Sequence, residues 1–190
     1  MPTAFDVLAK DHQEVKDMLV ELEKGPTAAS GATEHQLALR KKMAQQLVIE
    51  ESKHEAVEEM YFWPAVRQHL ENGDKLADEA QQQEQEGKEV LDRLDKLGAE
   101  DAEFEILLAQ FIKDGREHIA FEETRVWPRL RTALSAEQAE EIGSKLEAGK
   151  KTAPTRPHPK TPAAPGVLKT AGPAVAAADR IRDKATGRNE

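Results

Sequence analysis

One segment of this chain occurs twice, and the repeat restricts what the chain can fold into. Residues 54–64 read HEAVEEMYFWP and residues 118–128 read HIAFEETRVWP, so a His, two Glu, a Trp and a Pro recur at a constant offset of 64 residues. Residues four apart on a helix lie on one face. Each copy therefore predicts a helix that presents an imidazole and a carboxylate in one direction. Two such helices facing each other would bring two His and two Glu to one interior point.

Apolar residues at helical spacing predict four long helices separated by short loops. We expect them from Thr3 to Gly25, from Thr33 to Asn72, over 75–97 and over 102–133, with a shorter helix over 136–149. Three pairs of residues have the capping-box spacing that marks a helix start: Thr3 with Asp6, Thr33 with Gln36, and Ser135 with Gln138. Pro64 and Pro128 lack the amide donor, so each should kink its helix.

These helices predict an all-α fold, an up-down-up-down four-helix bundle with a short fifth helix and a disordered C-terminal tail. Residues 1–150 would form the bundle. Residues 151–175 carry six prolines among Ala, Thr and Lys, and cannot bury enough apolar surface to fold alone. Residues 151–190 are therefore predicted to be a basic, mostly disordered tail, in which residues 175–186 form a short helix that is marginal without a partner.

The third predicted helix echoes the first at an offset of 72 residues. In that alignment Glu84 takes the place of His12, which lies in the apolar stripe of Leu8, Val15 and Leu19. The chain is thus a double repeat, and a double repeat implies an approximate two-fold axis. That axis would place His12 across from Glu84, and the two His-x-x-x-Glu pairs across from each other.

The composition narrows the chemistry of such an interior cluster. The chain has no Cys, which excludes disulfides, iron–sulfur clusters, thiolate zinc sites and Cys nucleophiles. Residues 151–190 hold eight Lys or Arg and three Asp or Glu, a net charge of +5, so residues 1–150 carry −14. An acidic body argues against a nucleic-acid surface. Because no long apolar stretch or secretory signal occurs, we expect a cytoplasmic protein with no membrane contact, and a monomer or weak dimer.

Six side chains are the candidate metal ligands: His12, His54, Glu58, Glu84, His118 and Glu122. Three nitrogen donors and three carboxylates suit iron or manganese and could take zinc. Without metal, the carboxylates would be buried and mutually repelling. A single His-x-x-x-Glu pair is more often an ion pair on a helix surface, so a metal-free structural bundle stays an alternative. Two copies on apolar faces favour the metal site.

Several neighbouring residues have two readings. Glu59 and Glu123 lie one residue further round the helix than the candidate ligands, and we expect them in solvent or in a second layer around the metal. Glu50 and Asp114 each precede a candidate His by four residues and could hold its other ring nitrogen, with a position on the surface as a nearly equal alternative. For Tyr61 a place in the core is favoured over a metal-bound phenolate.

These residues resemble the hemerythrin family, specifically its HHE cation-binding branch, over about residues 4–134. The shared pattern is a lone His on the first helix, His-x-x-x-Glu on the second, one ligand on the third, and His-x-x-x-Glu on the fourth. The segment 179–188 also resembles the tails of actinobacterial hemerythrin-like proteins. The resemblance implies the hemerythrin four-helix bundle and a centre of two non-haem iron ions, with manganese or zinc less favoured. The resemblance also implies these ligand roles: Glu58 and Glu122 bridge the irons, His12 and His54 bind one, and Glu84 and His118 bind the other.

The sequence departs from the oxygen-carrying hemerythrins in two ways. Their third helix supplies two His, whereas here no His occurs between His69 and His118. Their fourth-helix acid follows its His by five residues, whereas here Glu122 follows His118 by four. Fewer nitrogen donors and more carboxylate favour the ferric state, which puts reversible oxygen carriage in doubt.

We therefore expect a di-iron protein that reacts with or binds a small ligand such as peroxide, nitric oxide or O2. A catalase-like or peroxidase-like reaction is one form that this activity could take. The basic, Pro-rich tail keeps a second hypothesis open, a non-enzymatic module that senses or stores oxygen or iron.

Overall fold

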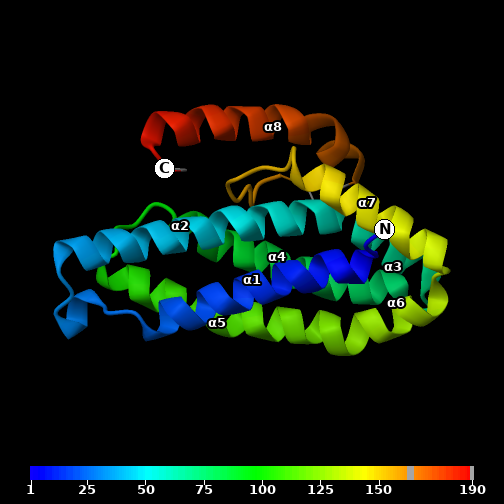
Figure 1. The fold of residues 1–190 in the computed structure, drawn as a ribbon, viewed down its shortest axis with the longest axis horizontal. Helices are drawn as coiled ribbons and strands as arrows, with labels where there is room; N and C mark the ends of the chain where they lie inside the picture. Colours follow the sequence, from blue (N-terminus) through cyan, green and yellow to red (C-terminus); the bar gives the residue numbers. More distant parts are fainter. Residues whose placement is uncertain (162–164, 189–190) are drawn as a thin grey trace.

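Four long helices run side by side along the long axis of the molecule (Figure 1). The computed structural model describes residues 1–161 and 165–188. Its long helices are α1 (Ala4–Lys24), α2 (Glu34–Val57), α4 (Gly73–Leu94) and α5 (Ala102–Phe121), and a short 3-10 turn, η1 (Ala28–Ser30), follows α1. Contacts join α1 to α2, α2 to α4, α4 to α5, and α5 back to α1. This closed ring confirms the predicted all-α, up-down-up-down bundle.

The helix starts are set by the side chains that the sequence singles out. Thr3, Thr33 and Ser135 each accept a hydrogen bond from the backbone amide three residues on, so all three predicted capping boxes are confirmed. Helix α4 begins at Gly73, two residues earlier than predicted. A Cβ at Gly73 would lie 2.2 Å from the carbonyl oxygen of Val66, so only glycine permits the tight turn that leads into α4.

Both copies of the repeated segment contain a wide π-helical turn. The first, η2 (Glu58–Phe62), follows α2 and leads into α3 (Trp63–His69); the second, η3 (Glu122–Val126), follows α5 and leads into α6 (Trp127–Ala133). The amide of Trp63 donates to the carbonyl oxygen of Glu58, five residues back, and Trp127 donates to Glu122 in the same way. The irregular turn in each helix therefore starts at the candidate Glu ligand. The proline lies just after it, in the first turn of the next helix. Turns of this kind are frequent at functional sites.

A polar layer divides the apolar interior into two clusters. The cluster on one side of the layer includes Phe5, Leu8, Trp63 and Trp127. The cluster on the other side includes Val15, Leu47, Phe104 and Phe111. On α1, His12 lies between Leu8 of the first cluster and Val15 of the second, so a buried imidazole interrupts an apolar stripe. The layer between the two clusters therefore carries the buried polar side chains of the bundle.

Helix α7 (Ala136–Lys150) crosses one end of the bundle and contacts α1 and α2. Residues 151–161 then turn back over the bundle, and α8 (Pro165–Thr186) lies along its outer face above α2 (Figure 1). The helix begins ten residues before the predicted 175. Residues 162–164 and 189–190 of the predicted tail lie outside the described residues. Among the described residues, no helix combines the length and the apolar character needed to cross a bilayer.

A network of ion pairs joins the described part of the tail to the bundle. Arg156 contacts Asp183 at 2.7 Å and Asp95 at 3.1 Å, while Arg188 contacts Asp95 at 2.8 Å. The side chains of Asp183 and Arg188 are almost completely buried. Asp95 at the end of α4 thus links Arg156 and Arg188 of the tail to the bundle. The composition of the tail alone does not reveal this contact.

Candidate metal centre

The structure brings all six candidate ligands into the polar layer. They form two overlapping groups, in each of which the possible ligand atoms lie within 4.8 Å of one another: His12, His54, Glu58 and Glu122, and Glu58, Glu84, His118 and Glu122. Both groups contain Glu58 and Glu122. This is the grouping expected if these two carboxylates bridge a pair of cations, although their role as ligands stays a prediction.

Each imidazole turns its Nε2 atom toward a carboxylate at the centre. His54 Nε2 lies 3.2 Å from Glu58 Oε2 on the next turn of the helix, and His118 Nε2 lies 3.3 Å from Glu122 Oε1 in the same relation. His12 reaches across from α1, with its Nε2 3.1 Å from Glu122 Oε2. Three imidazoles and the two shared carboxylates thus converge from α1, α2 and α5 and from the start of each π turn.

Most of the nitrogen and oxygen atoms at the centre that could bind a metal have no hydrogen-bond partner. Within the described part of the chain, seven of these buried atoms make no hydrogen bond: His12 Nε2, His118 Nε2, both carboxylate oxygens of Glu58 and of Glu122, and Glu84 Oε2. The contacts of about 3 Å noted above bring charges together without the angles of a hydrogen bond. Leaving buried polar atoms unpaired costs about 1–3 kcal/mol each, and more for charged groups. Bound cations would supply the partners that these atoms lack, so the residues present fit a metal site.

The pKa values of the centre show how strongly its charges interact. Burial alone would lower the pKa of His118, but the negative charges of Glu122 and Glu84 outweigh it and raise that pKa to about 9. Burial would raise the pKa of Glu122, yet His118 and His12 hold it well below its usual range. For Glu58 and Glu84, burial and the neighbouring carboxylates both act in one direction and raise the pKa. Without a cation, the cluster therefore needs protons to offset its negative charge.

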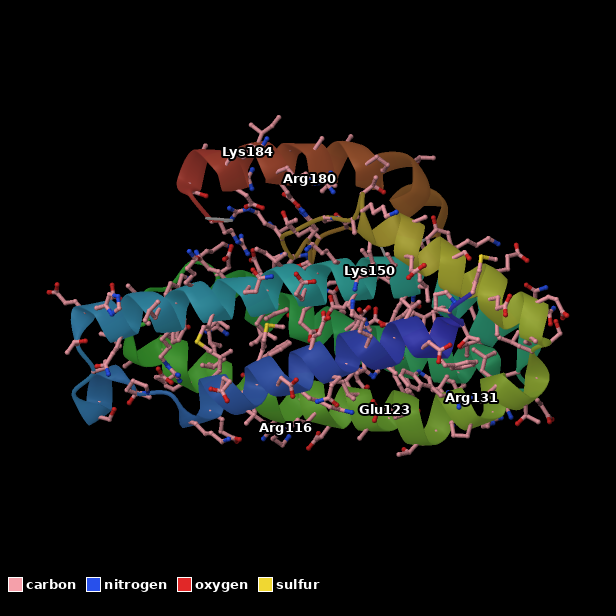
Figure 2. All side chains as sticks on the ribbon, in the orientation of Figure 1. Arg116, Glu123, Arg131, Lys150, Arg180 and Lys184 are labelled. Atoms are coloured by element: carbon pink, nitrogen blue, oxygen red, sulfur yellow. The ribbon has the colours of Figure 1, made fainter. Side chains whose placement is uncertain are left out.

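A second layer of polar side chains holds the outer nitrogen of every candidate His. The Nδ1 atoms lie against three different partners: His54 against Asp11 (3.4 Å), His118 against Gln83 (2.9 Å), and His12 against Glu123 (3.1 Å). Nδ1 would then donate its hydrogen outward and Nε2 would keep its lone pair for the centre. Two of these partners are held in turn, because Lys150 donates to Asp11 and Lys16 donates to Glu123. Figure 2 shows Lys150 and Glu123 on opposite sides of α1.

The prediction that Glu50 and Asp114 hold the imidazoles is wrong. Glu50 binds Gln46 and Lys53 instead, and Asp114 contacts Lys113. The rings project between helices, so their outer nitrogens meet side chains of neighbouring helices rather than of their own. A signal for the real partners was available, because each one directly precedes or follows a candidate ligand in the chain.

The two tryptophans of the repeat contact His12 and Glu84, the pair of candidate ligands whose residue type differs between the halves. Trp127 stacks on His12 with ring centroids 4.8 Å apart. Trp63 donates its indole hydrogen to a carboxylate oxygen of Glu84. Both tryptophans are buried in the first apolar cluster, and they also fix the positions of His12 and Glu84.

An open cleft of about 250 Å³ reaches the centre from one side, between α2, α4 and α5. Its walls include the candidate ligands Glu84 and His118. The His118 side chain keeps 13% of its surface exposed, compared with 1% for His12 and 4% for His54. We call this space the acidic cleft; it connects the Glu84 and His118 side of the centre to solvent.

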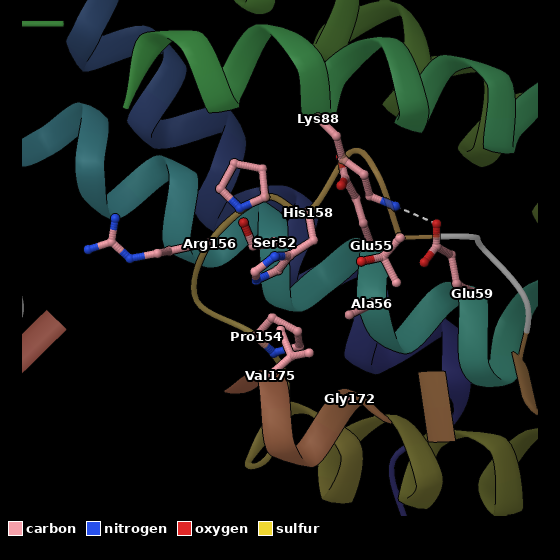
Figure 3. A pocket seen from close by; sticks show the side chains of 12 residues that line it. Ser52, Glu55, Ala56, Glu59, Lys88, Pro154, Arg156, His158, Gly172 and Val175 are labelled. Atoms are coloured by element: carbon pink, nitrogen blue, oxygen red, sulfur yellow. Dashed lines mark hydrogen bonds and ion pairs between the residues drawn. The ribbon is translucent and has the colours of Figure 1, made fainter. Parts of the chain in front are cut away.

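The sequence reading missed a second buried charged group under the tail. Lys88 reaches from α4 to donate to Glu59, and Glu55 lies beside them on the same wall of a small pocket, roofed by Pro154 and His158 of the tail (Figure 3). Glu55 and Glu59 are both almost fully buried. Glu59 therefore does not lie in solvent, one of its two predicted positions. It is buried and paired with Lys88. Tyr61 is half-buried and packs against the first apolar cluster, as predicted.

Comparisons with known proteins agree with this geometry. A model of the hemerythrin HHE cation-binding domain family matches residues 3–130. An uncharacterized hemerythrin-like protein of Schizosaccharomyces pombe is 28% identical over 184 residues, which cover 96% of this chain and 86% of that protein. The crystal structure of a hemerythrin HHE cation-binding domain-containing protein from Mycobacterium kansasii has a similar fold, with a TM-score of 0.63 and 19% identity over 94% of this chain and 99% of that one.

Proposed function

This chain belongs to the hemerythrin HHE cation-binding family, and from that premise we propose that it is a non-haem di-iron protein that reacts with small oxygen species, above all peroxide or nitric oxide. Family membership implies that it binds a metal cation. The observation that carries the proposal is the pair of overlapping ligand groups that share Glu58 and Glu122. One shared pair of carboxylates supports two adjacent cations rather than one.

The donor set supports iron. Three imidazole nitrogens and three carboxylates suit iron or manganese better than the softer metals that prefer thiolates. Bound iron would supply a Lewis acid and a redox centre. The carboxylate-rich side, with Glu84 and His118, faces the acidic cleft, so a small ligand can approach that side while the His12 and His54 side stays closed. The tryptophans and the outer layer of Asp11, Gln83 and Glu123 would keep the imidazoles oriented.

Metal analysis of the purified protein tests the first step. We expect two iron ions per chain and a large loss of iron in the His54→Ala variant. The exposed His35 offers a matched control, since His35→Ala also removes an imidazole from α2 but should keep both ions.

Peroxide decay tests the second step. Iron-loaded protein should consume peroxide faster than the His54→Ala variant, and the His35→Ala control should behave like the unchanged protein. A rate that is the same in all three would reject the reaction while leaving the metal centre in place.

A second candidate function is a non-enzymatic sensor or store, and the position of the tail favours it. Helix α8 contacts η2, the π turn that begins at Glu58. A change at the centre could therefore alter the docking of the tail. If so, metal loading should change the protease sensitivity of residues 151–190, and Asp183→Ala, which removes a buried partner of Arg156, should abolish the difference.

A further inference from the structure

The acidic cleft is lined by several carboxylates besides the candidate ligand Glu84. Six acidic residues line it, and no Lys or Arg is among its described lining residues: Glu51, Glu55, Glu84, Glu86, Asp114 and Glu117. A cleft lined by one sign of charge concentrates ions of the opposite sign and raises their association rate. The cleft therefore has the charge expected of a passage for cations.

The acidic residues of the cleft range from exposed to almost completely buried. The side chains of Glu117 and Asp114 are 66% and 45% exposed. Glu51 is 8% exposed, Glu55 is 4% exposed, and the candidate ligand Glu84 is 2% exposed. A cation moving inward would thus meet acidic groups at every depth.

Glu55 is the member of this series that points to a bound ion. It is almost completely buried, and within the described residues its Oε2 atom has no hydrogen-bond partner. Its Oε1 atom lies 3.6 Å from where a Cβ on Gly87 would stand, and Gly87 lines the cleft. The ammonium group of Lys88 donates to Glu59. Glu55 is thus held at the wall of the cleft with an oxygen still to be satisfied.

Glu51 and Glu55 are one turn apart on α2, so their side chains share a face. Two carboxylates at that spacing could bind one divalent cation that keeps its remaining water ligands. At the offset of the repeat, their counterparts in the second half of the chain are Gly115 and Ile119. The two acids are therefore an addition to one half, and the bundle itself does not need them.

We propose that the acidic cleft is the route by which ferrous iron reaches the centre, with Glu51 and Glu55 as an outer cation-binding position that passes the ion to Glu84 and His118. This inference rests on the proposed function, because it presupposes an iron centre. The outer position holds the ion through two carboxylates only, so it binds weakly and releases the ion inward to the richer ligand set.

The test is the rate of iron loading into metal-free protein. Ferrous iron is added without oxygen, a strong chelator is added after a series of delays, and the iron that the chelator cannot remove is measured. Glu51→Gln and Glu55→Gln keep the size of each side chain and remove its charge. Glu50→Gln is the matched control, because Glu50 is on the same helix but binds Gln46 and Lys53 outside the cleft.

We expect the double variant of Glu51 and Glu55 to load about tenfold more slowly, the lower end of the effect that a charged cleft has on association. The final iron content should stay equal to that of the unchanged protein. Added salt should slow loading of the unchanged protein more than loading of the double variant. The Glu51→Gln single variant, which leaves Glu55 in place, should show a smaller slowing and guards against a folding defect in the double variant.

Two results would overturn the inference, and they differ in what they say of the centre. Equal loading rates in all variants, with two iron ions bound at the end, would reject the route and keep the di-iron centre. Absence of bound iron in the unchanged protein would reject the centre and the route together.

Discussion

The two halves of the bundle are α1 to α3 and α4 to α6. They share the contacts that hold the candidate ligands, but they differ in the side chains around the centre. In the first half Asp11 holds His54, and at the repeat offsets Gln83 holds His118. Lys88 donates to Glu59, and Lys16 donates to Glu123. The repeat therefore preserves contacts between helices as well as residue types, and the shared contacts form the scaffold of the centre.

The differences between the halves determine which side of the centre is open. Gly87 lines the acidic cleft, and at the repeat offset the first half has Val15 in its place. Val15 is buried in the second apolar cluster and fills the equivalent space. A valine at this position thus goes with a closed side of the centre, and a glycine goes with the open side.

The largest effect should come from a carboxylate that both halves share. Glu122→Ala removes a member of both ligand groups, so we expect the protein to lose both cations. His12→Ala removes a ligand from one group only and should leave the other ion bound. Metal content after dialysis measures both, with the exposed Glu21→Ala as control. Two ions retained in the Glu122 variant would contradict the shared role.

The pH dependence of the metal-free protein tests the charge balance of the centre. The pKa of His118 is raised from 6.5 to about 9, so its charge stabilises the fold below about 6.5 and this contribution is lost as pH rises through about 9. The raised pKa values of Glu58 and Glu84 act in the same direction, because burial and repulsion penalise their ionised forms. Metal-free protein should therefore melt at a lower temperature at pH 9 than at pH 6.5.

Bound cations replace these protons and should remove the decline. Thermal unfolding with and without iron at the two pH values measures the difference. The His118→Asn variant without metal should show a smaller loss between them. A metal-free melting temperature that rises with pH would show that the buried acids are not protonated as described.

The outer layer offers a direct comparison of the halves. Asp11→Ala and Gln83→Ala each remove the partner of one imidazole Nδ1 atom, and loss of such a partner weakens metal binding by about 10-fold to 100-fold. Competition with a chelator gives the affinities. We expect the Asp11 variant to lose more, because a carboxylate polarises the imidazole more strongly than an amide does. Equal affinities in both variants and the unchanged protein would remove these residues from the site.

The smallest effect concerns the glycine at the open side. A Cβ at Gly87 would make ordinary contacts of 3.6 Å with Glu55 and 3.7 Å with Phe111. Gly87→Ala in the middle of α4 should therefore stabilise the protein by about 0.5–1 kcal/mol, while it narrows the cleft. Chemical unfolding measures the first effect. A loss of stability would show that the space beside Gly87 is already filled.

The sequence predicts the helices, their caps and the six converging side chains because these depend on local spacing and on the repeat. It does not predict the partners of the imidazoles, since Asp11, Gln83 and Glu123 reach their rings across helix interfaces. Nor does it predict the contacts of the tail with the bundle, since Asp95, which Arg156 and Arg188 contact, lies far away in sequence. The burial of Glu55 is not predicted either, because it depends on the packing of α4 and of the tail against α2.

The most direct test of the centre is anomalous diffraction at the iron edge from crystals of the iron-loaded protein. Two adjacent peaks should appear between Glu58 and Glu122, one beside His12 and His54 and the other beside Glu84 and His118. A single peak, or peaks away from Glu58 and Glu122, would contradict a pair of cations held by two shared carboxylates.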